Sequence, residues 1–298
     1  MPGFFDVLGH EQTIAHMKSA IEANKVSHAY LLAGEKGSGK KMLAGIFART
    51  LQCDAHGSEP CGKCHSCIQA ESGNQPDIIY VTHEKPGSIS VDDIRGQVNG
   101  DIQIKPYSSP YKIYIIDEAE KLTQQAQNAL LKTIEEPPEY GVVILLTSNI
   151  TALLPTIQSR CLIMEFRPLS NSIVEEFLRT QGQVPDYLAK ASAAFAQGNL
   201  GKAMRYAKSE DFIETKDMIL NLLRHVQDMT VNDMLENIKE LGTRKDEVRD
   251  YIDLMELWYR DVLIFKATKN INQLIFQDES TNITKEASLR GYEQIEHI

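Results

Sequence analysis

The sequence lacks any apolar run that approaches the roughly 18 residues needed for a membrane-spanning helix. Its N-terminus, MPGFFDVLGHEQ, has no basic segment followed by an apolar one, so no signal peptide is expected. No internal repeat or low-complexity tract stands out among the 298 residues, which are enough for two or three domains. We therefore expect a cytoplasmic globular protein.

Positively charged residues are also relatively few. Lys and Arg total 31 against 41 for Asp and Glu, which gives a net charge of -10. This disfavours broad coating of nucleic acid, because duplex binding depends largely on neutralising phosphates. The simplest interpretation is a solvated acidic surface that keeps the protein soluble. A local basic patch, or DNA contact shared with partner subunits, stays open.

Cysteine is scarce except in one segment. Four of the five cysteines, Cys53, Cys61, Cys64 and Cys67, follow the spacing C-x7-C-x2-C-x2-C, and Cys161 lies far away in sequence. Four thiolates on a short, turn-rich segment can close a tetrahedral Zn²⁺ site with no open position. The spacing predicts a structural zinc site, with four unrelated reduced cysteines as the alternative.

The first part of the chain alternates between strand-like and helix-like segments. Mostly apolar, β-branched runs occupy residues 28–34, 77–84, 111–118, 142–149 and 162–166. Such runs suit strands buried on both faces of a parallel sheet. Between them, the segment TQQAQNALLKTIEE predicts an amphipathic helix that Pro137 and Pro138 end. The pattern predicts an α/β fold with a mainly parallel sheet.

After Pro168 the strand pattern disappears. Three short helices are predicted up to about residue 208, and longer helices follow from about residue 211. In the longest, KDEVRDYIDLMELWYRDVLIFKATK, four apolar residues repeat at helical spacing: Ile252, Met255, Tyr259 and Val262. We interpret that stripe as a helix-packing face rather than a functional site.

The segment GEKGSGKK, residues 34–41, is typical of a phosphate-binding loop between a strand and a helix. The glycines Gly34, Gly37 and Gly39 let main-chain N–H groups surround phosphate oxygens, and Lys40 reaches the β- and γ-phosphates. The alternative is an incidental glycine-rich turn. Lys41 replaces the usual Ser or Thr that gives its hydroxyl to Mg²⁺. We expect metal-assisted hydrolysis to suffer most, while phosphate binding survives.

An acidic pair ends the strand in IYIIDEAEKL. Asp117 could hold Mg²⁺ through water, and Glu118 could polarise an attacking water. A DE pair alone is a weak signal, but one that follows a phosphate loop in an α/β domain favours a nucleotide site.

Taken together, HAYLLAGEKGSGK, the four-cysteine insert, IIDEAEKLTQQAQNALLKTIEEPP, LLTSN and TIQSRC resemble the bacterial clamp-loader branch of the AAA+ family. The resemblance covers roughly residues 4–208. It implies an ATP-driven assembly of DNA polymerase III that opens a sliding clamp and places it on primed DNA. The partners it implies are gamma or tau motor subunits, a delta subunit, the clamp, and DNA through the complex.

The same resemblance implies a RecA-like AAA+ domain at 1–167 with the zinc insert at 53–67, a three-helix lid at 168–208 and an all-α collar at 209–298. Arg160 of the SRC triplet would act in trans as an arginine finger. Thr147 would occupy the polar sensor position near the γ-phosphate.

Two departures from the motor pattern decide which role to expect. Motor subunits carry a hydroxyl residue where Lys41 stands, and a lid arginine where Gly201 stands; Lys202 or Arg205 is the alternative for that arginine. We expect a non-motor, stator-like subunit whose own ATP and Mg²⁺ binding is in doubt. The alternatives are a working ATPase that uses Lys40, Asp117 and Glu118, and an AAA+ protein of another DNA-processing machine.

Overall fold

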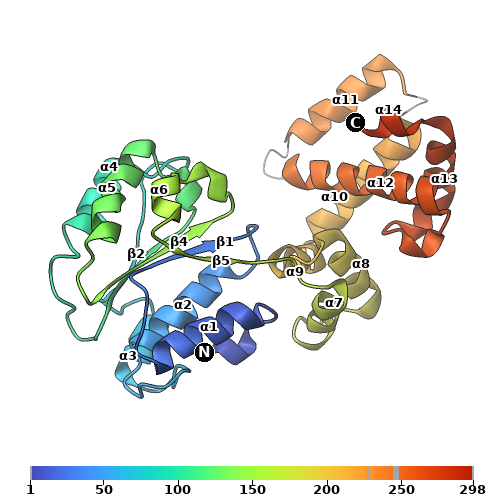
Figure 1. Cartoon of the computed structure of the whole chain (residues 1–298). Coiled ribbons are helices and arrows are strands. Elements are labelled where there is room, and N and C mark those ends of the chain that lie inside the picture. Colours follow the sequence, from blue (N-terminus) through green and yellow to red (C-terminus); the bar gives the residue numbers. More distant parts are fainter. Residues whose placement is uncertain (1, 227–228, 244–247, 297–298) are drawn as a thin grey trace. The chain divides into compact units, whose positions relative to one another are not determined.

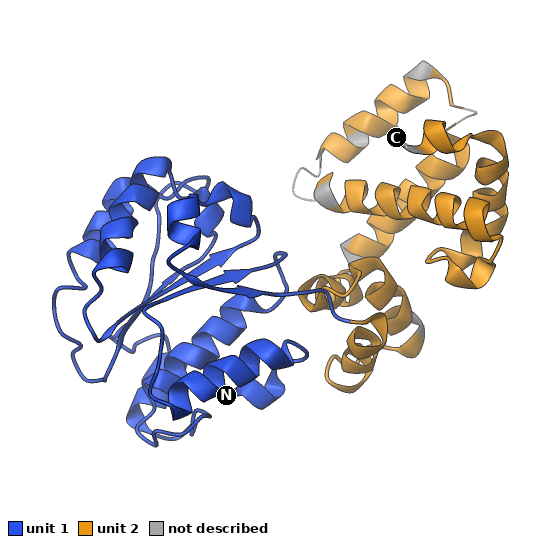
Figure 2. Cartoon of the chain, in the orientation of Figure 1, with its two compact units in different colours: residues 1–169 blue, residues 170–298 orange. Residues whose placement is uncertain are grey.

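The computed structural model describes residues 2–226, 229–243 and 248–296. The chain forms two compact units, Met1–Leu169 and Ser170–Ile298, drawn in blue and orange in Figure 2. Among the described residues, strands occur in the first unit and the second is helical. This change near residue 170 agrees with the loss of strand pattern after Pro168.

The first unit is built on a parallel sheet, with five strands in the described part of the chain. The strands are β1 (Ala29–Ala33), β2 (Ile78–Tyr80), β3 (Lys112–Ile116), β4 (Gly141–Thr147) and β5 (Leu162–Glu165). Their order across the sheet is β2-β3-β4-β1-β5. Each overlaps one of the five predicted apolar runs, and the predicted α/β class is confirmed.

Helices cover both faces of this sheet. They are α1 (Glu11–Glu22), α2 (Lys40–Leu51), α3 (His65–Glu71), α4 (Val91–Ile94), α5 (Gln124–Glu135) and α6 (Pro155–Gln158). In Figure 1, α1 and α2 lie on one face, and α4, α5 and α6 on the other. Shorter helical turns span Phe4–Asp6, Arg95–Asn99, Ala119–Lys121 and Ile150–Ala152.

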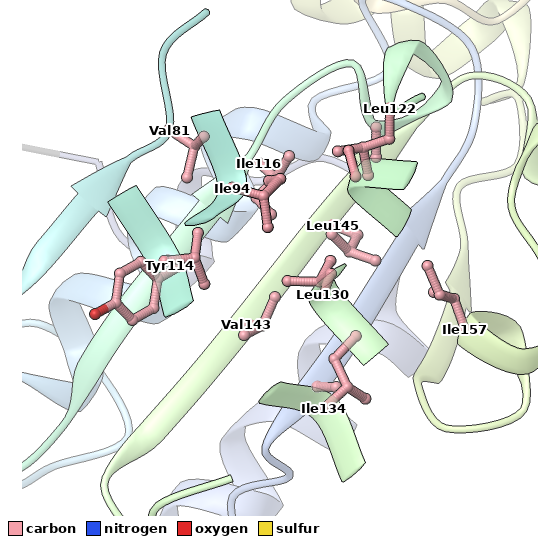
Figure 3. Close-up of a cluster of buried hydrophobic side chains, with 14 of the residues drawn as sticks. Val81, Ile94, Tyr114, Ile116, Leu122, Leu130, Ile134, Val143, Leu145 and Ile157 are labelled. Carbon is pink, nitrogen blue, oxygen red and sulfur yellow. The ribbon is translucent and has the colours of Figure 1, made fainter. Parts of the chain in front are cut away.

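Both faces of the sheet are buried. Figure 3 shows the core in which Ile116 of β3 and Leu145 of β4 pack with Leu130 of α5. The preceding strand residues, Ile115 and Ile144, join the second core on the opposite face. Successive strand side chains point to opposite faces, so burial on both sides requires the nearly continuous apolar runs seen in the sequence.

The parallel arrangement brings the carboxyl ends of several strands to one edge of the sheet. β1 ends at Ala33 before the glycine-rich loop, β3 ends at Ile116 before the acidic pair, and β4 ends at Thr147. Ligands of open parallel sheets bind outside these carboxyl ends. The fold therefore gathers three of the predicted segments at one place.

The second unit contains the helices α7 (Asn171–Thr180), α8 (Asp186–Ala196), α9 (Leu200–Lys208), α10 (Glu210–His225), α11 (Val231–Thr243), α12 (Val248–Thr268), α13 (Ser280–Leu289) and α14 (Tyr292–Glu296), with short turns at Ile271–Gln273 and Gln277–Glu279. α7, α8 and α9 pack together, while α12 packs against α10 and α13. Ser170, Asn199 and Ser209 begin α7, α9 and α10 as side-chain N-caps.

The predicted packing stripe of α12 is wrong at its first residue. Ile252 is 51% exposed, whereas Val262 is buried. The buried face instead runs through Tyr251, Leu254, Trp258 and Val262 to Phe265. Apolar residues occupy more than one face of this helix, so helical spacing alone selected a stripe displaced from the packed one. Residues 245–247 of the predicted helix lie outside the described residues.

Candidate nucleotide site and cysteine cluster

The glycine-rich loop joins β1 to α2. Gly37 and Gly39 have φ angles of 92° and 93°, a left-handed conformation that glycine adopts without steric cost. Gly34 is required by a close approach, because a Cβ there would lie 2.6 Å from Phe166 Cβ and 2.9 Å from the Phe166 main-chain oxygen. The Gly34 N–H donates to the Thr147 main-chain oxygen at 3.0 Å, which ties the loop to β4.

Lys40 begins α2, and its side chain turns back into the loop. Its Nζ donates to the main-chain oxygens of Gly34 at 2.5 Å and Glu35 at 2.8 Å, and the residue is only 8% exposed. Burial lowers the pKa of Lys40, and the nearby carboxylates of Glu120, Asp117 and Glu35 oppose that shift. Among the described residues no carboxylate forms an ion pair with this ammonium group, so a buried cation lies at the loop without a direct anionic partner.

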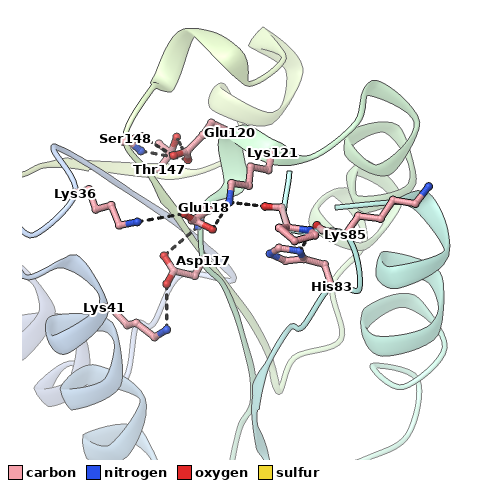
Figure 4. Close-up of polar contacts among 11 residues, drawn as sticks. Lys36, Lys41, His83, Lys85, Asp117, Glu118, Glu120, Lys121, Thr147 and Ser148 are labelled. Carbon is pink, nitrogen blue, oxygen red and sulfur yellow. Dashed lines mark hydrogen bonds and ion pairs between the residues drawn. The ribbon is translucent and has the colours of Figure 1, made fainter. Parts of the chain in front are cut away.

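Lys41, the next residue, forms an ion pair with the carboxylate that follows β3. Its Nζ lies 3.1 Å from Asp117 Oδ2 (Figure 4). The two side chains are 65% and 41% exposed, and an ion pair this open to solvent is worth at most about 1 kcal/mol. Its consequence is that an ammonium group pairs with the carboxylate that the sequence analysis assigned to Mg²⁺.

Glu118 has a left-handed φ of 52°, which is uncommon for a residue with a Cβ. Its carboxylate contacts two ammonium groups, Lys121 Nζ at 2.5 Å and Lys36 Nζ at 3.8 Å (Figure 4). The Glu118 N–H donates to Asp117 Oδ1 at 3.0 Å. Two ammonium groups therefore compete with a water molecule for this carboxylate.

Thr147 is fully buried and bonded to Glu120, a residue that the sequence analysis did not select. The Thr147 hydroxyl donates to Glu120 Oε2 at 2.9 Å, and Ser148 donates to the same carboxylate through its hydroxyl and its N–H. Burial raises the pKa of Glu120, but these hydrogen bonds outweigh it, so the net pKa is lowered. Glu120 lies in the turn after β3 and its donors lie at the end of β4, so the contact depends on the order of the strands in the sheet.

These side chains surround a cavity of about 520 Å³. Of the predicted site residues, Gly37, Gly39, Lys40, Lys41, Asp117, Glu118 and Thr147 line it. The residues that the sequence analysis missed are Lys36, Met42, Glu120, Leu146 and Ser148. Lys36 and Glu120 belong to the segments already singled out, so the loop-to-acidic-pair pattern could have pointed to them. Gly34 supports the loop from outside the lining.

Arg160 is not part of this cavity lining. It follows α6, where its Nη2 lies 2.9 Å from Glu135 Oε1 and its Nη1 donates to the Thr156 main-chain oxygen at 3.0 Å. Its side chain is 40% exposed. The neighbouring Cys161 packs against the core, and burial raises the pKa of that thiol to about 12.

The four predicted metal ligands come together around the start of α3, which contains Cys67. The sulfur atoms of Cys53, Cys61, Cys64 and Cys67 all lie within 4.8 Å of one another, and those of Cys53 and Cys64 are 4.0 Å apart. A tetrahedral zinc ion with Zn–S bonds of about 2.3 Å requires sulfur separations of about 3.8 Å. The cluster therefore fits a zinc ion after small adjustments.

Main-chain N–H groups support thiolates in this cluster. Those of Cys61, Cys64 and Cys67 donate to the sulfurs of Cys53, Cys61 and Cys64 at 3.3–3.4 Å. N–H groups of Lys63 and Cys64 lower the pKa of Cys61 to about 6, whereas burial raises the pKa of Cys53 and Cys67. A metal ion would offset the burial effect, because it binds the deprotonated form.

The candidate lid residues form ion pairs within the second unit. Lys202 Nζ lies 2.7 Å from Asp253 Oδ2, and Arg205 Nη2 lies 2.5 Å from Asp250 Oδ1. Both acidic partners belong to α12. The two basic side chains therefore hold α9 to α12.

No helix in the part of the chain that the structure describes is long and apolar enough to cross a membrane.

Comparison with known proteins gives a family match. A family profile described as DNA polymerase III, delta subunit, matches residues 9–170. DNA polymerase III subunit tau of Bacillus subtilis is 31% identical over 294 residues, covering 91% of this chain and 52% of that protein. DNA polymerase III subunit delta' of the same organism is 31% identical over 282 residues, covering 90% and 81%.

A third relative is DNA polymerase III subunit tau/gamma of Haemophilus influenzae. It is 34% identical over 243 residues, covering 78% of this chain and 35% of that protein. The chain thus spans about half the length of the Bacillus subtilis tau subunit and a smaller share of the tau/gamma subunit. Identity to the tau and delta' subunits is equal, so overall similarity does not separate the two roles.

Proposed function

Because this chain belongs to the bacterial clamp-loader family of AAA+ proteins, we propose that it is a delta-prime subunit of the DNA polymerase III clamp loader. In this role it is a stator: it helps to place the sliding clamp on primed DNA without hydrolysing ATP itself. Its partners are gamma or tau and delta subunits. The names of the relatives support the complex, and the site supports the choice of subunit.

The observation that carries this choice is the ion pair between Lys41 and Asp117. Mg²⁺ requires oxygen ligands in a near-octahedral arrangement, and phosphate loops provide one from a Ser or Thr after the lysine. Lys41 offers no oxygen, and its ammonium group repels a divalent cation from the same carboxylate. These residues do not fit Mg²⁺, and no hydrolytic step through a metal is assigned to this chain.

The contacts of Glu118 support the same conclusion. A general base must be able to accept a proton from the attacking water. Here Lys121 and Lys36 lie against the carboxylate and compete with a water molecule for it. The metal position and the base position both differ from those of a working ATPase.

We assign Arg160 the role of an arginine finger for an adjacent motor subunit. Its guanidinium group is half-exposed and lies outside this chain's own cavity lining. A planar guanidinium is always charged and binds phosphate in a bidentate manner, and such a group supplied in trans stabilises the transition state of phosphoryl transfer. The contact with Glu135 holds the side chain until a neighbour presents its γ-phosphate.

The same proposal divides the helical part of the chain. Residues 168–208 form the lid, and residues 209–298 form the collar that joins neighbouring subunits. Gly201 leaves the lid without the arginine of a motor subunit. Lys202 and Arg205 do not replace it, because both are engaged by acidic residues of α12.

We propose that the cysteine cluster holds a structural zinc ion. Its four sulfurs satisfy a tetrahedral ion and leave no position for a reacting water. The insert between α2 and α3 has little apolar core of its own, so the metal supplies its stability.

A motor subunit is the alternative function, favoured by the 31% identity to subunit tau over 91% of this chain. ATP turnover by the purified chain decides between the two. We expect no turnover above that of the Lys40→Ala variant, because Lys41 displaces the metal. Turnover that Lys40→Ala removes would establish the motor alternative and overturn the stator proposal.

A further inference from the structure

We propose that the loop binds the polyphosphate chain of a nucleotide without Mg²⁺, and that the Lys41 ammonium group takes the place of the metal. This inference deepens the proposed function and rests on it in one respect, because the inference and the stator proposal both depend on the misfit between Mg²⁺ and Lys41. The stator proposal concerns the absence of hydrolysis, whereas this inference concerns binding.

The first support is the buried charge of Lys40. An ammonium group has three donors, and the loop carbonyls of Gly34 and Glu35 satisfy two of them. Burying a cation is unfavourable unless an anion compensates it. Lys40 lines the cavity and no described carboxylate is paired with it directly, so an anionic ligand in the cavity would add a close partner to the longer-range compensation from Glu120, Asp117 and Glu35.

The second support is the conformation of the loop. Left-handed φ angles at Gly37 and Gly39 are typical of loops whose successive N–H groups form a concave anion site. The loop leads directly into the twelve-residue helix α2, whose N-terminal end favours negative charge.

The third support is the freedom of the Lys41 ammonium group to move. Its ion pair with Asp117 is open to solvent, so separating the two groups requires at most a small free energy. The long, flexible lysine stem lets the ammonium group bridge Asp117 and a phosphate oxygen, or move to the phosphate alone. A monovalent cation held by the protein thus supplies part of the charge that Mg²⁺ supplies in a motor subunit.

The acidic side of the cavity does not exclude an anion. Lys41 faces Asp117, and Lys36 and Lys121 face Glu118. The cavity lining includes Lys36, Lys40 and Lys41 against Asp117, Glu118 and Glu120, so the two signs balance before a metal is considered. In an otherwise equal site with Thr at position 41 the lining would be net negative, and a metal would be needed to offset the phosphates.

The test is calorimetric titration of the purified full chain with ATP, in EDTA and in MgCl₂. We expect binding in EDTA to be at least as tight as in MgCl₂. Lys41→Thr should reverse this, with binding in EDTA at least about tenfold weaker than in MgCl₂, because it restores a hydroxyl ligand and removes the cation. Lys40→Ala should weaken binding by at least about tenfold in both buffers.

Lys25→Met is the matched control, since it removes an exposed lysine outside the cavity lining and should leave both titrations unchanged. Competition by inorganic tripolyphosphate tests whether phosphate is the recognised part, and a failure to compete would contradict the proposal. Two other results overturn it: no binding of ATP at millimolar concentration, or wild-type binding that requires Mg²⁺. Neither result alone affects the stator proposal, which falls only if turnover is observed.

Discussion

The ammonium group of Lys41 and the carboxylate of Asp117 meet at 3.1 Å, although they follow different strands of the sheet. Lys41 lies in the first turn of α2 after β1, and Asp117 directly follows β3, with β4 between those two strands. The parallel sheet brings them together because it aligns the ends of all three strands at one edge. One side chain thus changes the chemistry of the site while the fold that builds it is kept.

The trans role of Arg160 predicts a loss of activity in a neighbour. In a reconstituted clamp loader, Arg160→Ala should leave assembly intact and lower ATP turnover at the site it serves by about 10³-fold or more. Steady-state ATPase and size-exclusion chromatography of the complex measure the two quantities.

Glu135→Gln is the matched control for Arg160, because it removes the ion pair at 2.9 Å and retains the guanidinium group. We expect near-normal turnover from that variant. Unchanged turnover in the complex that contains Arg160→Ala would refute the finger role, whatever the control shows.

The zinc proposal predicts about one zinc ion per chain by metal analysis. Cys64→Ser should remove it and lower the thermal midpoint, because the insert depends on the metal for its stability. Cys161→Ser is the control: this partly buried thiol lies outside the cluster, so the zinc content should stay at one. Wild-type protein that is purified with well under one zinc ion per chain would contradict the proposal.

Much of the α/β unit could be predicted because its signals are local. Apolar runs located the five described strands, and the glycines of residues 34–41 placed the loop between a strand and a helix. Pro137 and Pro138 follow the C-cap of α5, Glu136, as the sequence indicated. In each case the physical cause acts on the residues that display it: burial on both faces for the strands, access to positive φ for the glycines and a fixed φ for the prolines.

The missed features depend on contacts between distant segments. The bonds from Thr147 and Ser148 to Glu120 exist because β3 and β4 are neighbours, which no local pattern encodes. The displaced stripe of α12 has a similar origin. Apolar residues cover several faces of that helix, so its buried face depends on where α10 and α13 pack.

Gly34 should tolerate no side chain. In Gly34→Ala the new Cβ would meet both the side chain and the main chain of Phe166, and overpacking of this kind destabilises by about 1–3 kcal/mol. Gly96→Ala is the matched control, since nothing lies within 4 Å of its added Cβ, and we expect it to be neutral or slightly stabilising. Urea denaturation compares the variants; equal stability of the two would contradict the crowding at Gly34.

Glu120 should contribute stability that acid removes. Its pKa is lowered from 4.5 because the hydrogen bonds from Ser148 and Thr147 to its carboxylate outweigh burial. A carboxyl group whose pKa is lower in the folded state stabilises the fold above its unfolded pKa, and that stabilisation is lost as the pH falls through the folded value. Glu120→Gln should therefore be less stable than wild type at neutral pH, since the amide is uncharged and keeps only one of the two oxygens that accept from these donors.

The difference in the free energy of unfolding between wild type and Glu120→Gln should become smaller as the pH falls below about 4.5. The wild-type carboxyl group then becomes protonated and is uncharged too. Urea denaturation of both proteins at neutral and acidic pH measures it, and the comparison cancels the titration of carboxylates that both proteins share. Glu139→Gln, at an exposed position, should show no such convergence. A gap that stays constant with pH would mean that the charge of Glu120 does not hold Thr147 and Ser148 in place, and that neutral hydrogen bonding is sufficient.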